Sequence, residues 1–118
     1  MSKNIDHGLT IRQVKTIRQI LSLYADEINS VSLFGSRAQG KYRPNSDIDL
    51  VIRGDLSEKT GDRLWTLFFE SNLVLKVDIL LYDKIKKPAL KEHINLVELP
   101  LFTHKELECF QEKYEEIS

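Results

Sequence analysis

The sequence predicts a small domain of the α/β or α+β class, because apolar segments with helical spacing alternate with short, strand-like apolar runs. Two further observations support this class. The chain has 118 residues, of which 42% are hydrophobic and 30% charged, enough for one core without disulfides or a structural metal. Neither repeats nor low-complexity tracts interrupt it, so we expect a single domain over residues 1–118.

The first expected element is an amphipathic helix. Apolar residues recur at helical spacing from Ile11 to Ile28, and Thr10 with Gln13 has the pattern of a capping box at its start. A short run of apolar and β-tolerant residues at 30–34 then predicts a strand.

A second strand is expected over residues 47–53, after a polar loop at residues 40–46. Because most of this strand is apolar, we expect at least one of its faces to be covered. The next helix begins after Ser57, a favourable N-cap, and Asn72 is a suitable place for it to stop.

The C-terminal half predicts a third strand and two more helices. The strand is expected over residues 73–82, and Pro88 suits the first turn of a helix that runs to Ile94. The apolar segment 99–102 contains a proline, which confines any strand there to a sheet edge. Residues 103–117 have apolar residues at helical spacing and predict a final amphipathic helix.

Charge and composition exclude several classes of protein. The 17 Lys and Arg residues nearly balance the 18 Asp and Glu residues, so the surface has no general attraction for nucleic acid or an anionic bilayer. No segment approaches the roughly 18 uninterrupted apolar residues that a membrane span needs. The single Cys109 forms no internal disulfide and fits a reducing compartment. We therefore expect a cytoplasmic protein that binds neither membrane nor nucleic acid directly.

The strongest chemical signal lies between the first two expected strands, and its first half suits a phosphate. Gly35 and Ser36, directly after a strand, allow a sharp turn that exposes backbone amide donors, to which Ser36 adds its hydroxyl. Arg37, Lys41 and Arg43 beside this turn are either part of a solvated loop or cations that help to hold a triphosphate.

The second half of the same stretch suits a divalent cation. Asp47 and Asp49 are two residues apart, so on a strand their carboxylates leave the same face. The two charges repel, a cost that a bound ion removes, and oxygen ligands without His or Cys indicate Mg²⁺ or Mn²⁺. Asp78, an acid inside the third apolar run, is a candidate third ligand. Three convergent carboxylates suit a two-metal site for displacement at phosphorus.

Each of these features also has an ordinary structural interpretation. A Gly-Ser pair alone is usually a turn, and an Asp-x-Asp pair alone is commonly a solvated strand end. Asp78 alone fits an edge-strand charge that discourages aggregation. Their combination within one short stretch favours the functional interpretation.

The combined motif resembles the signature of the DNA polymerase β-like nucleotidyltransferase superfamily. The resemblance rests on Gly35-Ser36, ten intervening residues and Asp47-Ile48-Asp49. The whole stretch Gly-Ser-Arg-Ala-x-Gly-x-x-Arg-x-x-Ser-Asp-Ile-Asp-Leu is similar to minimal nucleotidyltransferases (MNT), which are often encoded beside a HEPN partner. The resemblance implies the polymerase β-like nucleotidyltransferase fold, a small mixed β-sheet flanked by helices.

The resemblance also implies a metal-dependent transfer of a nucleoside monophosphate, AMP from ATP in the expected case, to an acceptor hydroxyl. By motif position, Gly35 and Ser36 hold phosphates, while Asp47 and Asp49 bind two Mg²⁺ or Mn²⁺ ions. Asp78 completes the metal site and helps to deprotonate the acceptor.

The expected acceptor is a tyrosine of a HEPN-family partner, because tyrosine acceptors occur in similar MNT proteins. This chain would then be the antitoxin of a hetero-oligomer. Two alternatives remain open. One is an antitoxin that occludes its partner without catalysis, and the other is a subunit of an enzyme that modifies small molecules such as antibiotics.

Overall fold

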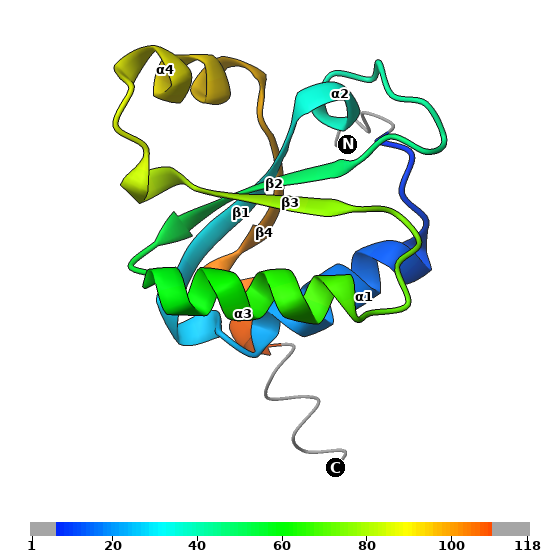
Figure 1. Ribbon diagram of the computed structural model, residues 1–118, viewed down its shortest axis with the longest axis horizontal. Coiled ribbons are helices and arrows are strands. Elements are labelled where there is room, and N and C mark those ends of the chain that lie inside the picture. Colours follow the sequence, from blue (N-terminus) through cyan, green and yellow to red (C-terminus); the bar gives the residue numbers. More distant parts are fainter. Residues whose placement is uncertain (1–6, 110–118) are drawn as a thin grey trace.

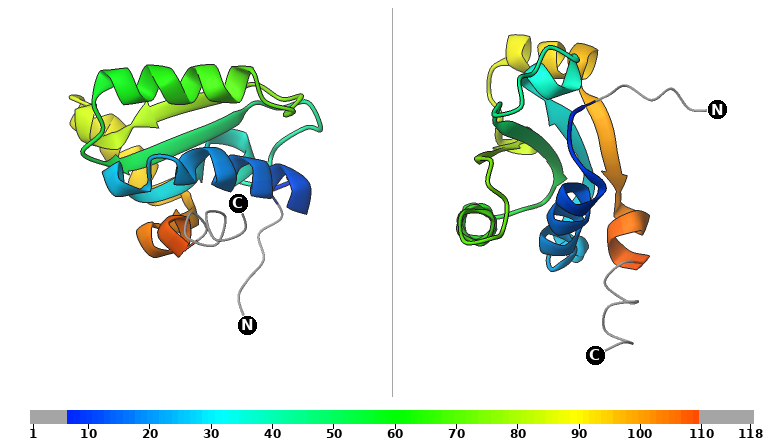
Figure 2. Two further views of the ribbon diagram at one scale, coloured as in Figure 1. Left: turned by 90° about the horizontal axis from the view of Figure 1, so that it is seen from below. Right: turned by 90° about the vertical axis from the view of Figure 1, so that its right-hand side faces the viewer.

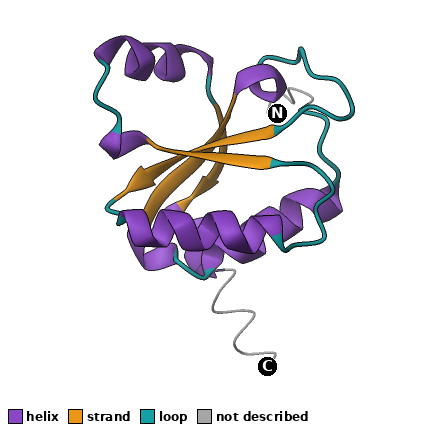
Figure 3. Ribbon diagram, viewed as in Figure 1, coloured by secondary structure: helices purple, strands orange, loops and turns teal. Residues whose placement is uncertain are grey.

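The computed structural model describes residues 7–109, which form a mixed four-stranded sheet with helices on both faces (Figures 1 and 3). The elements in chain order are α1 (Ile11–Ser22), the 3₁₀ turn η1 (Ala25–Glu27), β1 (Ile28–Phe34), α2 (Gly35–Ala38), β2 (Ile48–Gly54), α3 (Glu58–Phe69), β3 (Val77–Leu81), the 3₁₀ turn η2 (Tyr82–Lys84), α4 (Pro88–Val97) and β4 (Leu99–Thr103). The strand order is β3-β2-β1-β4, with β2 parallel to β3 and the other neighbours antiparallel. This confirms the predicted class, a small mixed sheet flanked by helices.

Helix α1 begins at the predicted capping box. The Thr10 hydroxyl accepts a hydrogen bond from the Gln13 amide (3.0 Å), and the Gln13 side chain accepts one from the Thr10 amide (2.9 Å). The helix ends at Ser22, so the prediction that it continues to Ile28 was wrong. Ile28 is the first residue of β1, but it is buried in the same core as the apolar side of α1. The helical spacing of buried residues therefore continues past the end of the helix.

Strands β1 and β2 pair at the centre of the sheet, close to the ranges predicted for them. Their register sets Phe34 opposite Asp49, and β2 begins at Ile48, one residue later than the sequence predicts. Helix α3 follows the predicted N-cap, where the Ser57 hydroxyl accepts a hydrogen bond from the Thr60 amide (3.1 Å). The helix carries the chain back across the sheet, so that β3 runs parallel to β2.

Strand β3 is shorter than the predicted range of 73–82. It comprises only Val77–Leu81, and the residues before it form a loop. In that loop Leu73 and Leu75 pack against the core, whereas Val74 between them is 92% exposed. Because burial alternates along this irregular segment, its sequence has the apolar pattern of a strand.

The last described elements agree with their predictions. Pro88 occupies the first turn of α4, which runs beyond Ile94 to Val97. Pro100 lies in β4, which is an edge strand, as predicted from the proline. Residues 104–109 are helical, and the rest of the helix predicted over 103–117 lies outside the described residues. Within the described part of the chain, no helix is long and apolar enough to span a membrane.

The two faces of the sheet are covered differently. Helices α1 and α3 lie side by side over one face, whereas α4 lies on the other (Figures 1 and 2). Along β2, Leu50 and Ile52 belong to the core beneath α1 and α3. Because side chains alternate along a strand, Asp49, Val51 and Arg53 point to the opposite face. We call this second face the charged face.

Candidate active site

The candidate site begins where β1 ends and the chain turns into α2. Gly35, the first residue of α2, has a φ of +72°, which side chains other than glycine rarely adopt. A Cβ atom at Gly35 would lie 2.5 Å from a carboxylate oxygen of Asp49. Asp49 reaches this position because it lies opposite Phe34, the residue before the glycine. Glycine is therefore required both by the backbone conformation and by the approach of the carboxylate.

Asp49 and Asp78 converge on the charged face. The parallel pairing of β2 with β3 puts the two residues directly in register. Burial raises the pKa of Asp49, and the charges of Asp78 and Asp47 raise it further, while Lys76 opposes the shift. The site thus gathers negative charge that a cation would neutralise.

Asp47 lies at the rim of the site and not on the strand. The sequence predicts that Asp47 and Asp49 leave the same face of one strand, but β2 begins at Ile48, and Asp47 is an exposed residue of the loop before it. Within residues 7–109, no three acidic, histidine or cysteine side chains are arranged to hold a metal ion. The structure therefore brings together Asp49 and Asp78, and the metal contact of Asp47 stays a prediction.

The donor atoms of this pair fit a divalent cation. Asp49 and Asp78 present carboxylate oxygens, the ligands that Mg²⁺ and Mn²⁺ prefer. Mg²⁺ is commonly held by one or two protein carboxylates together with water and substrate phosphates, so two converging carboxylates are sufficient. A cation between them would also relieve the repulsion that, after burial, raises the pKa of Asp49.

Arg37 is buried beneath the loop that leads to β2. It is only 1% exposed, and the ring of Tyr42 lies 5.0 Å from its guanidinium carbon. The guanidinium donates hydrogen bonds to the backbone carbonyl oxygens of His7 (2.9 Å), Arg43 (3.5 Å), Pro44 (3.3 Å) and Ser46 (3.0 and 3.2 Å). The sequence predicts a phosphate contact for Arg37, whereas the structure directs all three of its side-chain nitrogens to the backbone. Arg37 therefore holds the loop that carries Asp47.

The other predicted phosphate-binding residues lie at the surface of the same region. Ser36 is partly exposed, and its carbonyl accepts hydrogen bonds from the amides of Gln39 (3.2 Å) and Lys41 (2.9 Å), which closes the turn after β1. Arg43 is exposed, and its amide donates to the Ser46 hydroxyl (2.7 Å). The phosphate contacts of the Ser36 and Arg43 side chains stay predictions.

Two residues near the carboxylates were not expected from the sequence. Lys76 Nζ lies 3.6 Å from Asp78 Oδ1, and the spacing of these residues by two was a visible signal for this contact. His93 on α4 makes an edge-to-face contact with Phe34, with ring centres 5.7 Å apart. Because Phe34 lies opposite Asp49, this contact brings an imidazole to the charged face. No sequence signal indicated it, since α4 reaches the sheet only through tertiary packing.

Paired carboxylates that can hold divalent ions suit metal-assisted transfer at phosphorus. The family model of the nucleotidyltransferase domain matches residues 14–101. The chain therefore belongs to the nucleotidyltransferase domain family.

Solved structures agree with this membership. A structure described as a minimal nucleotidyltransferase is 30% identical, and the match covers 79% of this chain and 97% of that one with a TM-score of 0.61. A toxin-antitoxin structure with AMP-PNP is 23% identical over 88% of this chain and 85% of that one, with a TM-score of 0.63. The toxin-antitoxin MntA-HpeT structure is 21% identical over 88% and 84%, with a TM-score of 0.61. The last two show a shared fold, and a search of curated proteins finds no match.

Proposed function

We propose that the protein transfers AMP from ATP to a hydroxyl group of a partner protein and thereby acts as an antitoxin. The pairing of Asp49 with Asp78 beside Gly35 carries the proposal, in a chain that belongs to the nucleotidyltransferase family. The acceptor that we favour is a tyrosine of a HEPN-family toxin, with which the chain would form a hetero-oligomer. Support comes from the structural neighbours, of which two are toxin-antitoxin structures and one of these contains AMP-PNP.

In the proposed reaction, the acceptor oxygen attacks the α-phosphorus of ATP. A new oxygen–phosphorus bond forms, the bond from the α-phosphorus to the bridging oxygen of the β-phosphate breaks, and pyrophosphate leaves. The hydroxyl proton passes to the carboxylate of Asp78. Gly35 and Ser36 hold the β- and γ-phosphates, and Arg43 adds positive charge at the rim.

Asp49 and Asp78, with Asp47 beside them, would hold the Mg²⁺ or Mn²⁺ ions. Bound divalent ions supply charge stabilisation for the attacking and leaving oxygens. The chain itself orients the phosphates through the glycine turn and places a proton acceptor beside the hydroxyl. We place the reaction in the cytoplasm, which supplies ATP and suits the free, exposed Cys109.

The test is transfer of label from ATP that is labelled at the α-phosphate, with Mg²⁺ and a lysate of the parent cell. We expect a labelled protein whose labelling falls by at least about 10²-fold in the Asp47→Ala/Asp49→Ala variant. ATP labelled at the γ-phosphate is the matched control and must give no such product, because pyrophosphate leaves. Labelling that persists in the double variant would contradict the proposed site. If the double variant transfers nothing but still rescues growth against the toxin, the antitoxin acts by occlusion and not by catalysis.

A further inference from the structure

The outer edge of β3 is open. Since β3 ends the order β3-β2-β1-β4, no strand among residues 7–109 pairs with its outer side. The opposite edge of the sheet differs, because β4 contains Pro100, which lacks a backbone donor. Strand β3 contains neither proline nor glycine, so its edge is able to pair with another strand.

A groove follows this edge between β3 and one side of α3. On α3 it is lined by Glu58, Asp62 and Trp65, whose spacing puts them on one side of the helix. On β3 it is lined by the consecutive residues 78–81, and its volume is about 530 Å³. We call it the edge groove. It includes Asp78, and it therefore reaches the candidate active site.

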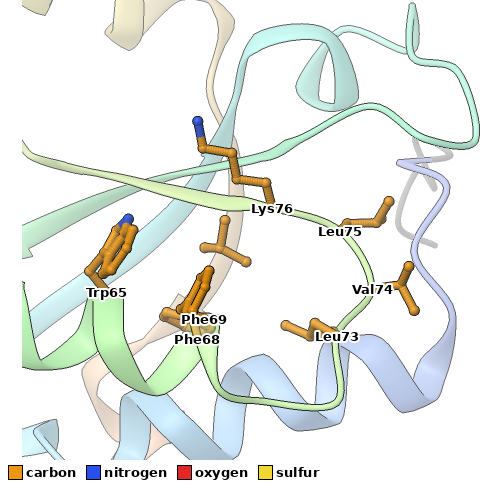
Figure 4. Close-up of a pocket in the computed structure, with 8 residues that line it drawn as sticks. Trp65, Phe68, Phe69, Leu73, Val74, Leu75 and Lys76 are labelled. Carbon is orange, nitrogen blue, oxygen red and sulfur yellow. The ribbon is translucent and has the colours of Figure 1, made fainter.

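A more apolar pocket of about 360 Å³ adjoins the edge groove at Trp65 (Figure 4). It is lined mainly by Trp65, Phe68, Phe69 and residues 73–77. The rings of Trp65 and Phe69 stack with centres 5.3 Å apart, although the two residues are 49% and 75% exposed. Aromatic side chains of this kind are typical anchors in protein interfaces.

A strand that pairs with β3 would send alternate side chains to the two faces of the sheet. The side chain beside Asp78 would point to the charged face, where Asp78 and its register neighbour Asp49 lie. The preceding and following side chains would point towards α3, where Asp62 and Trp65 line the groove. One extended segment can therefore present a hydroxyl to the carboxylates while it contacts α3.

The charge of the edge groove indicates the chemistry of that segment. Two carboxylates line the α3 side of the groove, those of Glu58 and Asp62, and no basic residue lines it. Such a lining favours Lys or Arg on the side of the segment that faces α3. The exposed ring of Trp65 adds a face that can bind a cation.

We propose that the edge of β3 is the docking site for the acceptor. An extended, basic segment of the partner protein pairs with β3 and places its acceptor hydroxyl beside Asp78. The proposal rests on the proposed function for the identity of the reaction, but the docking itself does not require catalysis.

The first experiment measures docking without transfer. The probe is a short synthetic peptide of alternating lysine and valine with tyrosine at its centre, and the matched peptide has glutamate in place of lysine. Trp65 is the single tryptophan of the chain, so its fluorescence reports occupation of the edge groove. We expect saturable binding of the basic peptide, at least about tenfold tighter than that of the acidic one. Those amides of residues 77–81 that do not already bond to β2 should become protected from hydrogen exchange in the complex.

Charge reversal in the groove tests the specificity. Asp62→Lys should remove the preference for the basic peptide, while binding of ATP with Mg²⁺ stays unchanged. Glu70→Lys is the matched control, because Glu70 is an exposed acid at the end of the same helix that does not line the groove. This control should keep the preference of the wild type.

Several outcomes would overturn the proposal. The two peptides could bind equally well, or neither could show saturable binding. The basic peptide could also bind without slowing hydrogen exchange at the outward-facing amides of β3. Protection of these amides in a dimer without peptide would mean that a second copy of the chain fills the groove, and this would also overturn it. If the basic peptide docks as expected but its tyrosine receives no label from α-labelled ATP, the docking site stands and the proposed function fails for this acceptor.

Discussion

The side chains on the two faces of β2 differ in chemistry, although they alternate along one strand. Leu50 and Ile52 are 0% and 1% exposed in the core formed with α1 and α3. Asp49 and Arg53 face the other way and are partly exposed. Burial of apolar area stabilises the first face, whereas the second holds charged groups in place. The apolar face therefore supplies the stability that allows charges to be gathered on its reverse side.

At one end of the charged face an arginine neutralises a carboxylate, whereas at the other end carboxylates lie beside one another. Arg53 donates hydrogen bonds to both carboxylate oxygens of Glu98 (2.7 and 2.9 Å), and the ring of Tyr82 lies 4.0 Å from its guanidinium carbon. Hydrogen bonding to Arg53 lowers the pKa of Glu98, whereas burial and like charges raise that of Asp49. A carboxylate with a raised pKa beside other carboxylates marks the end of the face that is suited to a ligand.

The largest change in the free energy of unfolding is expected from Leu50→Ala, on the apolar face next to Asp49. Leu50 is fully buried, and its truncation leaves a cavity, so the free energy of unfolding should fall by about 2–5 kcal/mol. Urea unfolding followed by tryptophan fluorescence measures the change. Leu96→Ala, at an 83% exposed position on α4, is the control and should stay within about 0.5 kcal/mol of wild type. A loss below about 1 kcal/mol at Leu50 would mean that this face does not carry the fold.

A smaller loss is expected from Arg37→Gln. Without the guanidinium, the partly buried carbonyl oxygens of His7 and Ser46 lose their donors, and we expect a loss of about 2–3 kcal/mol in the free energy of unfolding. Arg43→Gln, at an exposed position of the same loop, should change it by less than about 0.5 kcal/mol. Unfolding in urea and ATP binding measured on both variants separate two roles. If Arg37→Gln keeps the stability of wild type but binds ATP weakly, Arg37 contacts phosphate and does not hold the loop.

The sequence was sufficient to predict the fold class and the motif at the centre of the site. Strand and helix periods differ clearly over most of the chain, and the glycine turn is close to Asp49 both in the motif and in space. The role of Arg37 was not predictable, because its acceptors are backbone carbonyls that only the folded loop gathers. The loop before β3 was misassigned for a related reason, since Leu73 and Leu75 are partly buried by tertiary contacts in an alternation that resembles that of a strand.

The smallest change in stability is expected from Asp49→Asn, which should stabilise the protein at pH 7 where the other substitutions destabilise it. The carboxyl group of Asp49 is harder to ionise in the folded protein than in the unfolded chain, where its pKa is near 3.8. The folded state therefore binds this proton more tightly, and stability falls as the pH rises from the unfolded value through the raised folded value. At pH 7 the ionised carboxylate is a cost that asparagine lacks. With EDTA present, Asp49→Asn should therefore raise the midpoint of thermal unfolding at pH 7, and the difference should disappear below the unfolded pKa.

Addition of Mg²⁺ should make wild type more stable than Asp49→Asn. A bound cation stabilises the two ionised carboxylates of wild type, whereas the variant lacks one of these ligands. Asp55→Asn is the matched control, since Asp55 is an exposed acid just beyond the other end of β2, and it should show neither effect. If Asp49→Asn is less stable than wild type in EDTA at pH 7, the ionised carboxylate supports the fold. The contrast between a stabilising apolar face and a charged face that costs stability would then not hold at Asp49.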